Sequence, residues 1–490
     1  MIRRPALRPA VLRQDLAASM VVFLVALPLC VGIAVASGVP AELGLVTGIV
    51  GGLVTGMLPG SSLQVSGPAA GLAVLVYEAV TAYGLSVLGA VVLAAGVLQV
   101  AMGALRLGRW FRAISVSVVQ GMLAGIGLVL IAGQLYPLAG ARAPGGGTAN
   151  LMGLPSLLVN TLGSSRALTS AAVGGGTVLV LLVWRRLPAR VRLVPAQLAA
   201  VALATVVTAV GGLDVARIEV RGLLASIHPP GPGDLSRLVG TGLLGTVLAF
   251  ALIASAESLF SAAAVDRLHN GRRTDYDREL VAQGIGNTVC GLLGALPMTA
   301  VIVRSSVNVH AGARTKASRV LHGCWLLLFA ALLPVALAVI PVAALAGVLV
   351  HAGARLVPVS ALVPLWRAHR GEAVVLMTTA AAIVLTNLLE GVLLGLLLAV
   401  LKSAWETSHL QVEVTDEPDS GIRVRLSGSA TFLRLPRMLG ALEGLPRGRP
   451  ITLDLAELRH LDHACSTALQ DWAARHNAQG GNQVLVPAMP

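Results

Sequence analysis

The chain has little charge and few aromatic side chains: of its 490 residues, 12% are charged and 3% are aromatic. A soluble globular domain carries about 25% charged residues, so the composition excludes an ordinary soluble enzyme and a disordered regulator. It also excludes a nucleic-acid-binding protein as the explanation of the net charge of +13. Apolar residues make up 56% of the chain and glycine occurs 55 times. This combination is typical of closely packed transmembrane helices.

Cysteine is also scarce, because the chain has only Cys30, Cys290, Cys324 and Cys465. Their spacing shows no pairing and three of them lie in apolar segments, so we expect no disulfide framework. The basic N-terminus precedes an uncharged run, 16–41. This run is longer than the ~7–15 apolar residues of a signal peptide, so we expect it to be a retained first span.

Uncharged stretches locate the membrane spans, since a helix needs about 20 apolar residues to cross the bilayer core. The longer stretches are 16–41, 43–77, 79–105, 113–141, 143–165, 167–184, 193–213, 238–256, 280–303 and 320–354. Two of them are too long for one helix and must contain a break, at 59–62 in the first and at Pro334 and Pro341 in the second. The residues then indicate twelve to fourteen crossings that end near Ser408.

Basic residues orient the protein because they cluster between alternate spans, as in 185–192, 267–278 and 314–319. This alternation predicts a cytoplasmic N-terminus and an even number of spans in the cytoplasmic (inner) membrane. The same charges would attract anionic membrane lipid, so no nucleic acid partner is needed. After Ser408 the composition changes, and 409–490 is expected to be a small cytoplasmic α/β domain. Its expected elements are a hairpin over 412–426 with a turn at 416–421, helices at 433–445 and 464–477, and strands at 451–455 and 483–486.

Two apolar segments are interrupted in corresponding halves of the chain. In 63–71, Ser66 could cap a helix and Pro68 fits its first turn; in 297–306, a short β-branched run precedes Arg304 and hydroxyl residues. A helix that begins at membrane depth presents its free N–H groups and positive dipole end to a cavity. Such a pair points to a transporter's binding site. The alternative is an ordinary proline kink.

Glu257 is the only charge within 238–265. An intramembrane carboxylate costs at least ~2.5 kcal/mol unless it is paired or hydrated, so it is a functional candidate. Ser261 lies one turn further on the same helical face and could share a cation or proton site. The alternative is that Glu257 only pairs with Arg304. Glu42 is either a second proton carrier or, as we favour, an exposed carboxylate at a helix N-terminus.

Several motifs are missing from the chain. His460, His463 and Cys465 lack metal-ligand spacing, so no metal site is expected. No phosphate-binding Gly-rich loop and no His-Glu-x-x-His motif occurs, which argues against an ATP-driven pump and a zinc hydrolase. We therefore expect no enzyme and no cofactor apart from a coupling ion, H+ or Na+.

Four motifs resemble the SulP family, the prokaryotic relatives of mammalian sulfate and anion exchangers. They are Ser-Gly-Pro-Ala-Ala-Gly at 66–71, Ala-Glu-Ser-Leu at 256–259, Ala-Ala-Ala-Val-Asp-Arg-Leu at 262–268 and Val-Arg-Ser-Ser-Val-Asn at 303–308. The C-terminal region, with Asp454-Leu455 and 461–464, resembles a short STAS domain. The resemblance implies a polytopic α-helical membrane protein of fourteen segments in two inverted repeats of seven, as in the uracil-permease fold. Within 1–408, a core of spans 1–4 and 8–11 would move against a gate of spans 5–7 and 12–14.

The resemblance also implies the site. It assigns cation coupling to Glu257 and Ser261. The anion would lie between the half-helices, on Ser66, Gly67, Ala69, Ala70, Val301, Ile302, Val303, Arg304 and Ser305. Relatives that transport bicarbonate place hydroxyls where this chain has Ala69 and Ile302. The serine that is phosphorylated in regulatory relatives is absent, because His463-Ala464 follows Asp462.

The expected function is therefore secondary active symport of a small anion with a cation, by an elevator-like movement. Bicarbonate, sulfate and dicarboxylates remain open as substrates. We prefer protons to sodium, because few side-chain oxygens lie near Glu257 and a desolvated carboxylate suits proton exchange. The alternative is an uncoupled anion exchanger or channel, while an intramembrane enzyme is the weakest reading. A homodimer is expected.

Overall fold

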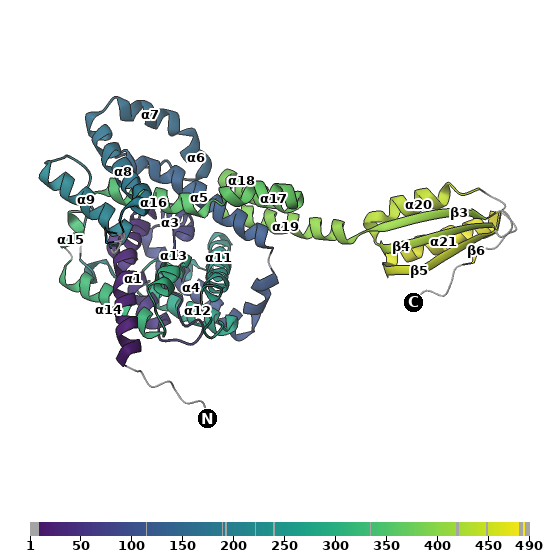
Figure 1. Ribbon diagram of the computed structural model, residues 1–490, viewed down its shortest axis with the longest axis horizontal. Helices are drawn as coiled ribbons and strands as arrows, with labels where there is room; N and C mark the ends of the chain where they lie inside the picture. The colour runs from purple at the N-terminus through teal and green to yellow at the C-terminus, as the bar shows by residue number, and fades with distance from the viewer. Residues whose placement is uncertain are drawn as a thin grey trace. The chain divides into compact units, whose positions relative to one another are not determined.

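The computed structural model describes residues 9–113, 115–188, 190–191, 194–220, 222–238, 241–333, 335–417, 421–446, 449–479 and 484–485. The expected break at Pro334, the turn residues 418–420 and positions 483 and 486 of the last expected strand lie outside these ranges. Contacts divide the chain into two units, Met1–Gly395 and Leu396–Pro490 (Figure 1).

Long helices build the first unit, and within the described residues they form two sets of seven. The first set is α1 (Pro9–Ala36), α2 (Ala41–Val50) with its π-helical continuation η1 (Gly51–Thr55), α3 (Ala70–Tyr83), α4 (Leu85–Ala104), α5 (Val116–Leu138), α8 (Ser165–Val183) and α9 (Ala196–Val210). The second set is α11 (Thr241–Asp266), α12 (Tyr276–Leu292), α13 (Ile302–His310), α14 (Ala317–Leu332), α16 (Val342–Leu356), α18 (Arg370–Leu385) and α19 (Leu388–Thr407).

Shorter elements connect these helices. They are η2 (Leu107–Ala113), α6 (Gly147–Met152), α7 (Leu154–Leu162), η3 (Trp184–Arg186), η5 (Leu224–Ser226), α10 (Pro232–Arg237), α15 (Val335–Ala338) and α17 (Val359–Ala368). Pro341 is the residue before α16, so the expected break there is confirmed.

Equivalent helices of the two sets make equivalent contacts. The packing of α4 against α12 corresponds to that of α2 and η1 against α14, and the packing of α1 against α14 corresponds to that of α11 against α4. Likewise α5 packs against α18 as α8 packs against α16. The two halves of the chain are therefore structural repeats, and the expected fold class is confirmed.

A two-stranded sheet joins the repeats at their centre. β1 (Ser66–Pro68) pairs antiparallel with β2 (Met298–Ala300), with Ser66 opposite Ala300 and Pro68 opposite Met298. Every residue of both strands is buried. α3 follows β1 and α13 follows β2. Because the strands are antiparallel, the two helices begin at opposite ends of the small sheet.

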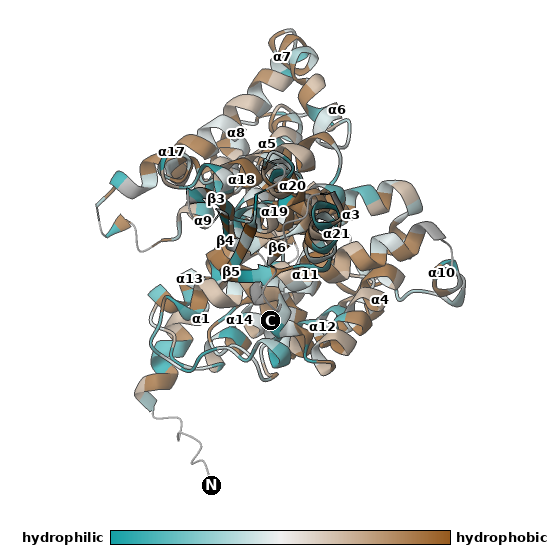
Figure 2. Cartoon of the chain, turned by 90° about the vertical axis from the view of Figure 1, so that its right-hand side faces the viewer, coloured by the Kyte–Doolittle hydropathy of each residue, from teal (hydrophilic) through white to brown (hydrophobic). Residues whose placement is uncertain are grey.

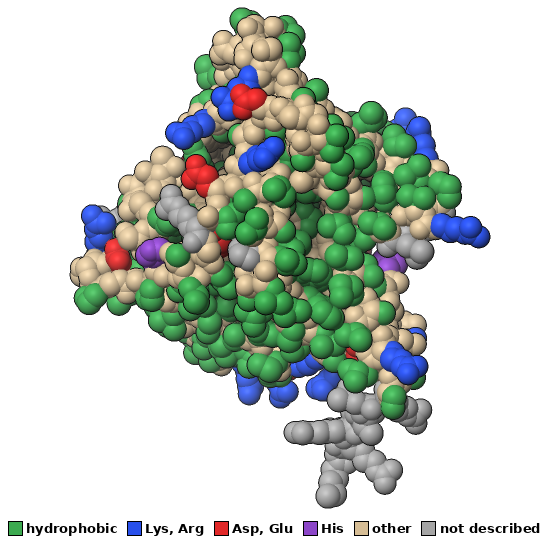
Figure 3. Space-filling model, turned by 90° about the vertical axis from the view of Figure 1, so that its left-hand side faces the viewer, with side chains coloured by type: hydrophobic (Ala, Val, Ile, Leu, Met, Phe, Trp, Pro, Cys, Tyr) green, Lys and Arg blue, Asp and Glu red, His purple; other side chains and the backbone are tan. Residues whose placement is uncertain are grey.

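The surface of the first unit is apolar. Leucine and valine side chains remain exposed on many helices, among them Leu158, Val206, Leu248 and Leu393, and the helices are hydrophobic along most of their length (Figure 2). Hydrophobic side chains cover the middle of the face in Figure 3, with arginine and lysine toward its edges. Within the described residues, seven helical segments are long and apolar enough to cross a membrane alone. A bilayer is the environment that accepts such a surface.

The second unit contains a four-stranded sheet in the order β3 (Leu410–Glu417), β4 (Gly421–Ala430), β5 (Ile451–Leu461), β6 (Val484–Leu485). β3 and β4 are the expected antiparallel hairpin, and the other pairs are parallel. The other elements are η6 (Phe432–Arg434), α20 (Leu435–Glu443) and α21 (His463–Gln479), and they close a separate hydrophobic core. β5 is longer than expected and ends at Leu461. The carboxylate of the next residue, Asp462, accepts the N–H of Cys465 at the start of α21. The unit is compatible with a STAS domain.

Candidate functional site

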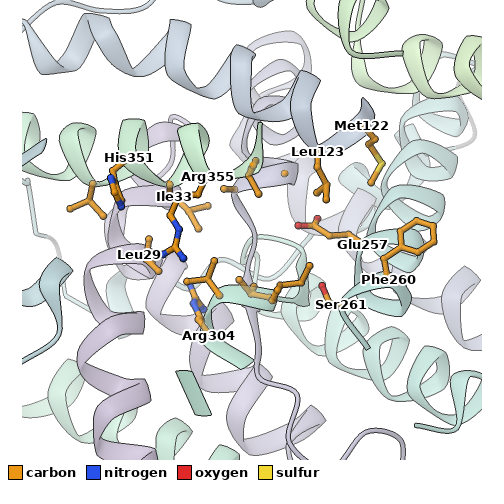
Figure 4. Close-up of a pocket in the computed structure, with 18 of the residues that line it drawn as sticks. Leu29, Ile33, Met122, Leu123, Glu257, Phe260, Ser261, Arg304, His351 and Arg355 are labelled. Carbon is orange, nitrogen blue, oxygen red and sulfur yellow. The ribbon is translucent and has the colours of Figure 1, made fainter. Parts of the chain in front are cut away.

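A pocket of about 90 Å³ lies between α1, α3, α5, α11, α13 and α16 (Figure 4). This volume accommodates several water molecules or one small anion. Seven of the eleven residues expected from the sequence line it: Ala70, Val301, Ile302, Val303, Arg304, Glu257 and Ser261.

Ser66 is not the cap of a helix, contrary to expectation. It lies in β1, and its hydroxyl accepts a hydrogen bond of 2.7 Å from Gln283 Nε2. α3 begins only at Ala70, after Ala69, without a side-chain cap. The reason is tertiary, because pairing with β2 keeps 66–68 extended past the point where local capping would begin a helix.

Ser66, Gly67, Ala69 and Ser305 lie behind the pocket wall rather than in it. The Ser305 hydroxyl donates to the Val301 carbonyl at 2.7 Å and accepts the Val65 N–H at 2.9 Å. It therefore ties the start of α13 to the strand of the other repeat. These residues shape the pocket through the backbone.

Arg304 is fully buried. Its Nη2 donates to the Pro68 carbonyl oxygen at 3.3 Å, whereas Nε and Nη1 have no hydrogen-bond partner. The guanidinium lies beside the Cys30 thiol and against Gly67, where any Cβ would collide with Nη1. A buried cation with unused donors needs an anion.

Glu257 lies over the first turn of α3. A Cβ added at Gly71 would be 2.9 Å from Glu257 Oε2, and this oxygen is buried without a hydrogen-bond partner. The Thr299 side chain of β2 lies close to the same carboxylate, and its hydroxyl donates to the Ala300 carbonyl oxygen at 3.3 Å. Sequence reasoning did not place Thr299 in the site, although a hydroxyl within a buried apolar run was an available signal.

Glu257 and Arg304 do not pair with each other, so the pairing alternative is wrong. Neither forms an ion pair within the described part of the chain. Figure 4 shows Arg304 toward one side of the pocket and Glu257 with Ser261 toward the other. Each charge is therefore left for a ligand of opposite sign.

Three further polar residues of the pocket were missed: Gln197 of α9, and His351 and Arg355 of α16. In the sequence, Arg355 only marks the end of the uncharged stretch 320–354. The uncharged stretch does not indicate the direction in which the Arg355 side chain points, because the packing of α16 against α5 and α8 determines it.

A larger cavity of about 780 Å³ adjoins the pocket and shares with it Val119, Leu123, Phe260 and Ile302. Its wall includes Asp266, Arg267, Arg273 and Thr274. The shared residues indicate a route from the pocket to the end of α11 where these arginines lie.

The break between η1 and β1 is held by polar side chains of the second repeat. Glu279 of α12 accepts the Ser61 N–H at 2.7 Å through Oε2 and bonds Gln283 through Oε1. Arg319 of α14 donates to the carbonyls of Gly56 at 2.8 Å and Leu58 at 2.9 Å. Irregular backbone is tolerated at membrane depth when protein groups satisfy it in this way.

Glu42 lies at the start of α2, as favoured, but it is buried and not exposed. Its Oε1 accepts the Gly222 N–H at 3.0 Å. The loop that precedes α10 folds over it. Within the described ranges, no three His, Cys, Asp or Glu residues are grouped to hold a metal ion.

Comparison with known proteins identifies the family of the chain. The model of the sulfate permease family matches residues 12–379. The chain is 28% identical to the bicarbonate transporter BicA of Synechocystis over 82% of this chain and 74% of that protein. It is 30% identical to the putative sulfate transporter YvdB of Bacillus subtilis over 97% of this chain and 91% of that protein.

Solved structures show the same fold. The transmembrane domain of a cyanobacterial BicA superposes with a TM-score of 0.68 at 26% identity, over 80% of this chain and 98% of that one. Murine Slc26a9 superposes with a TM-score of 0.80 at 15% identity, over 98% and 86% of the two chains. The resemblance of the four motifs to SulP proteins is thus confirmed: the chain is a transporter and not an enzyme, and it belongs to the sulfate permease family.

Proposed function

We propose that the protein is a secondary active transporter that takes up a small anion together with a cation. The observation that carries this proposal is the pair of uncompensated charges, Arg304 and Glu257, at one pocket. Burying either charge without a counter-ion is costly. Simultaneous occupation by an anion and a cation compensates both, and this mutual compensation is the physical basis of coupling.

The anion is held by Arg304 and by backbone N–H groups at the starts of α3 and α13. Free N–H groups and the dipole of a helix N-terminus favour negative charge. With Ala69 and Ile302 in place of hydroxyls, recognition rests on these backbone groups and the guanidinium. Bicarbonate, sulfate and dicarboxylates all present oxygens to such donors, and relatives of this chain carry the names bicarbonate and sulfate transporter.

The cation is a proton in preference to sodium. Glu257 and Ser261 supply the side-chain oxygens on that side of the pocket, and the apolar residues 301–303 line it as well. Thr299 lies close to the carboxylate but does not line the pocket. A proton needs one carboxylate oxygen, whereas sodium takes a shell of several oxygen ligands. Transport that at fixed pH requires sodium would contradict this preference.

The position of the pocket between two groups of helices supports alternating access. α1, α3, α11 and α13 of the proposed core line it from one side, and α5, α9 and α16 of the proposed gate from the other. An elevator-like movement of the core against the gate would carry the anion and the cation together. Spans 1–4 and 8–11 are α1 to α4 and α11 to α14.

The N-terminus and the STAS-like unit, 409–490, are placed in the cytoplasm, with the transport domain, 1–408, in the cytoplasmic membrane. The basic clusters support this orientation. A homodimer is proposed as the functional assembly, in contact with membrane lipid.

The deciding experiment is flux into proteoliposomes that contain the purified full-length chain. An imposed inward proton gradient should drive labelled bicarbonate or sulfate above its equilibrium concentration. An uncoupled exchanger or channel would only equilibrate the label, whatever the gradient. The Glu257→Gln variant separates the two mechanisms further, because it should lose accumulation in the first case only.

A further inference from the structure

The pocket holds two guanidinium groups and one carboxylate among its described lining residues: Arg304, Arg355 and Glu257. The two arginines lie toward one side of the pocket and Glu257 toward the other (Figure 4). A cation bound at Glu257 compensates the carboxylate. The charge offered to the anion is then that of two guanidinium groups.

The two arginines lie on helices that pack mainly against different neighbours. α13, which carries Arg304, packs against α1 and α11, whereas α16, which carries Arg355, packs mainly against α5 and α8 and also contacts α1. Arg304 is fully buried, while Arg355 lines the pocket and is exposed. Arg355 therefore lies at the rim, where an anion seated on Arg304 can meet it from the opposite group of helices.

Two like charges at one pocket repel each other, and an anion between them relieves the repulsion. Coulomb energy scales with the product of the charges. A divalent anion therefore gains about twice as much from the pair as a monovalent anion of the same shape.

We propose that Arg355 contacts the bound anion from the rim of the pocket and determines the preference for divalent over monovalent anions. This inference rests on the proposed function, because it requires the anion to be held by Arg304. It adds a specificity residue on α16 to a site otherwise built from α3, β2 and α13.

Sulfate and perchlorate test the proposal, since both are tetrahedral oxyanions and they differ in charge. Calorimetric titration of the purified full-length protein with each sodium salt, at one sodium concentration and pH, gives the ratio of their affinities. Arg355→Gln should weaken sulfate binding about ten-fold, at the low end for a charged hydrogen bond because the rim is hydrated. Perchlorate binding should change less than three-fold, and Arg355→Lys should keep part of the sulfate preference.

Arg367→Gln is the matched control, because it removes one exposed positive charge from the neighbouring α17. It should leave both affinities unchanged. An equal loss for the two anions in Arg355→Gln, or no loss in a variant that stays monodisperse, would overturn the proposal. If Arg304→Ala then still weakens both anions, the proposed function stands and only the role of Arg355 fails. If Arg304→Ala weakens neither anion, the proposed function fails as well.

Discussion

Arg304 of the second repeat donates a hydrogen bond from Nη2 to the carbonyl oxygen of Pro68 in the first repeat, over 3.3 Å. This bond spans the two interrupted segments beside the two-stranded sheet. It uses one face of the guanidinium and leaves Nε and Nη1 without partners. The same side chain thus joins the repeats and offers its charge to the pocket.

Arg304→Ala should weaken anion binding by about 1.5–3 kcal/mol, or ~10- to 150-fold, the range for hydrogen bonds to charged groups. Arg304→Lys should restore only part of the affinity. A single ammonium supplies a point charge but not the planar fork that reaches Pro68 and the pocket together. Titration with sulfate measures both variants, and full rescue by lysine would show that the fork geometry is irrelevant.

Glu257→Gln keeps the shape of the side chain and removes its charge. It should abolish uphill accumulation in proteoliposomes while anion exchange persists. Because Glu257 and Arg304 are not paired, the double variant with Arg304→Ala should be as inactive as the worse single variant. A double variant that regains coupled transport would mean that the two charges compensate each other.

Two glycines pack against the two charged groups, Gly67 against Arg304 and Gly71 against Glu257, so anion binding and cation coupling can be perturbed separately. A methyl group at Gly67 would collide with Arg304 Nη1, and one at Gly71 would lie 2.9 Å from Glu257 Oε2. Gly67→Ala should therefore lower anion affinity about ten-fold, as part of the charged hydrogen bonding is lost, with little effect on coupling stoichiometry. Gly71→Ala should alter the dependence of transport on the cation and leave anion affinity nearly unchanged. Identical effects from the two variants would refute this separation.

Removal of the chain after Ser408 should leave the order of substrate preference intact. Within the described residues, every side chain of the pocket belongs to the first unit, and the second unit has its own hydrophobic core. The measurement is competition of several anions against labelled sulfate in the truncated and full-length chains. A reordered series would show that the second unit contributes to selectivity.

Asp462 should stabilise the second unit as the cap of α21. Burial tends to raise its pKa, but hydrogen bonds from the N–H groups of Cys465 and Phe432 outweigh this effect and hold the pKa below its usual value. Asp462→Ala should cost about 1 kcal/mol of stability at neutral pH, typical of a lost cap. Because the pKa is lower in the folded state, this contribution is present above the unfolded pKa and is lost as the pH falls through the folded one. The two proteins should therefore converge in thermal stability in acid.

Sequence alone was sufficient for the class of the protein and for most of the site. Low charge and long apolar stretches reflect the hydrophobic thickness of a bilayer, a constraint that acts locally on every span. The same constraint made three features recognisable in the sequence: the interrupted segments around Pro68 and Arg304, and the isolated charge of Glu257. Each departs from what a lipid-exposed helix tolerates.

Tertiary structure alone decided how these parts face one another. Ser66 does not cap a helix as expected, because it lies in β1, which pairs with β2. The two strands are more than two hundred positions apart in the sequence. The pairing of Glu257 with Arg304 was allowed by charge and excluded by geometry. Arg355 and Thr299 entered the site through the packing of α16 and the sheet, and no local pattern encodes which face of a mostly apolar helix or strand meets a cavity. Side-chain periodicity reports burial, and in a membrane protein apolar faces meet lipid and protein alike.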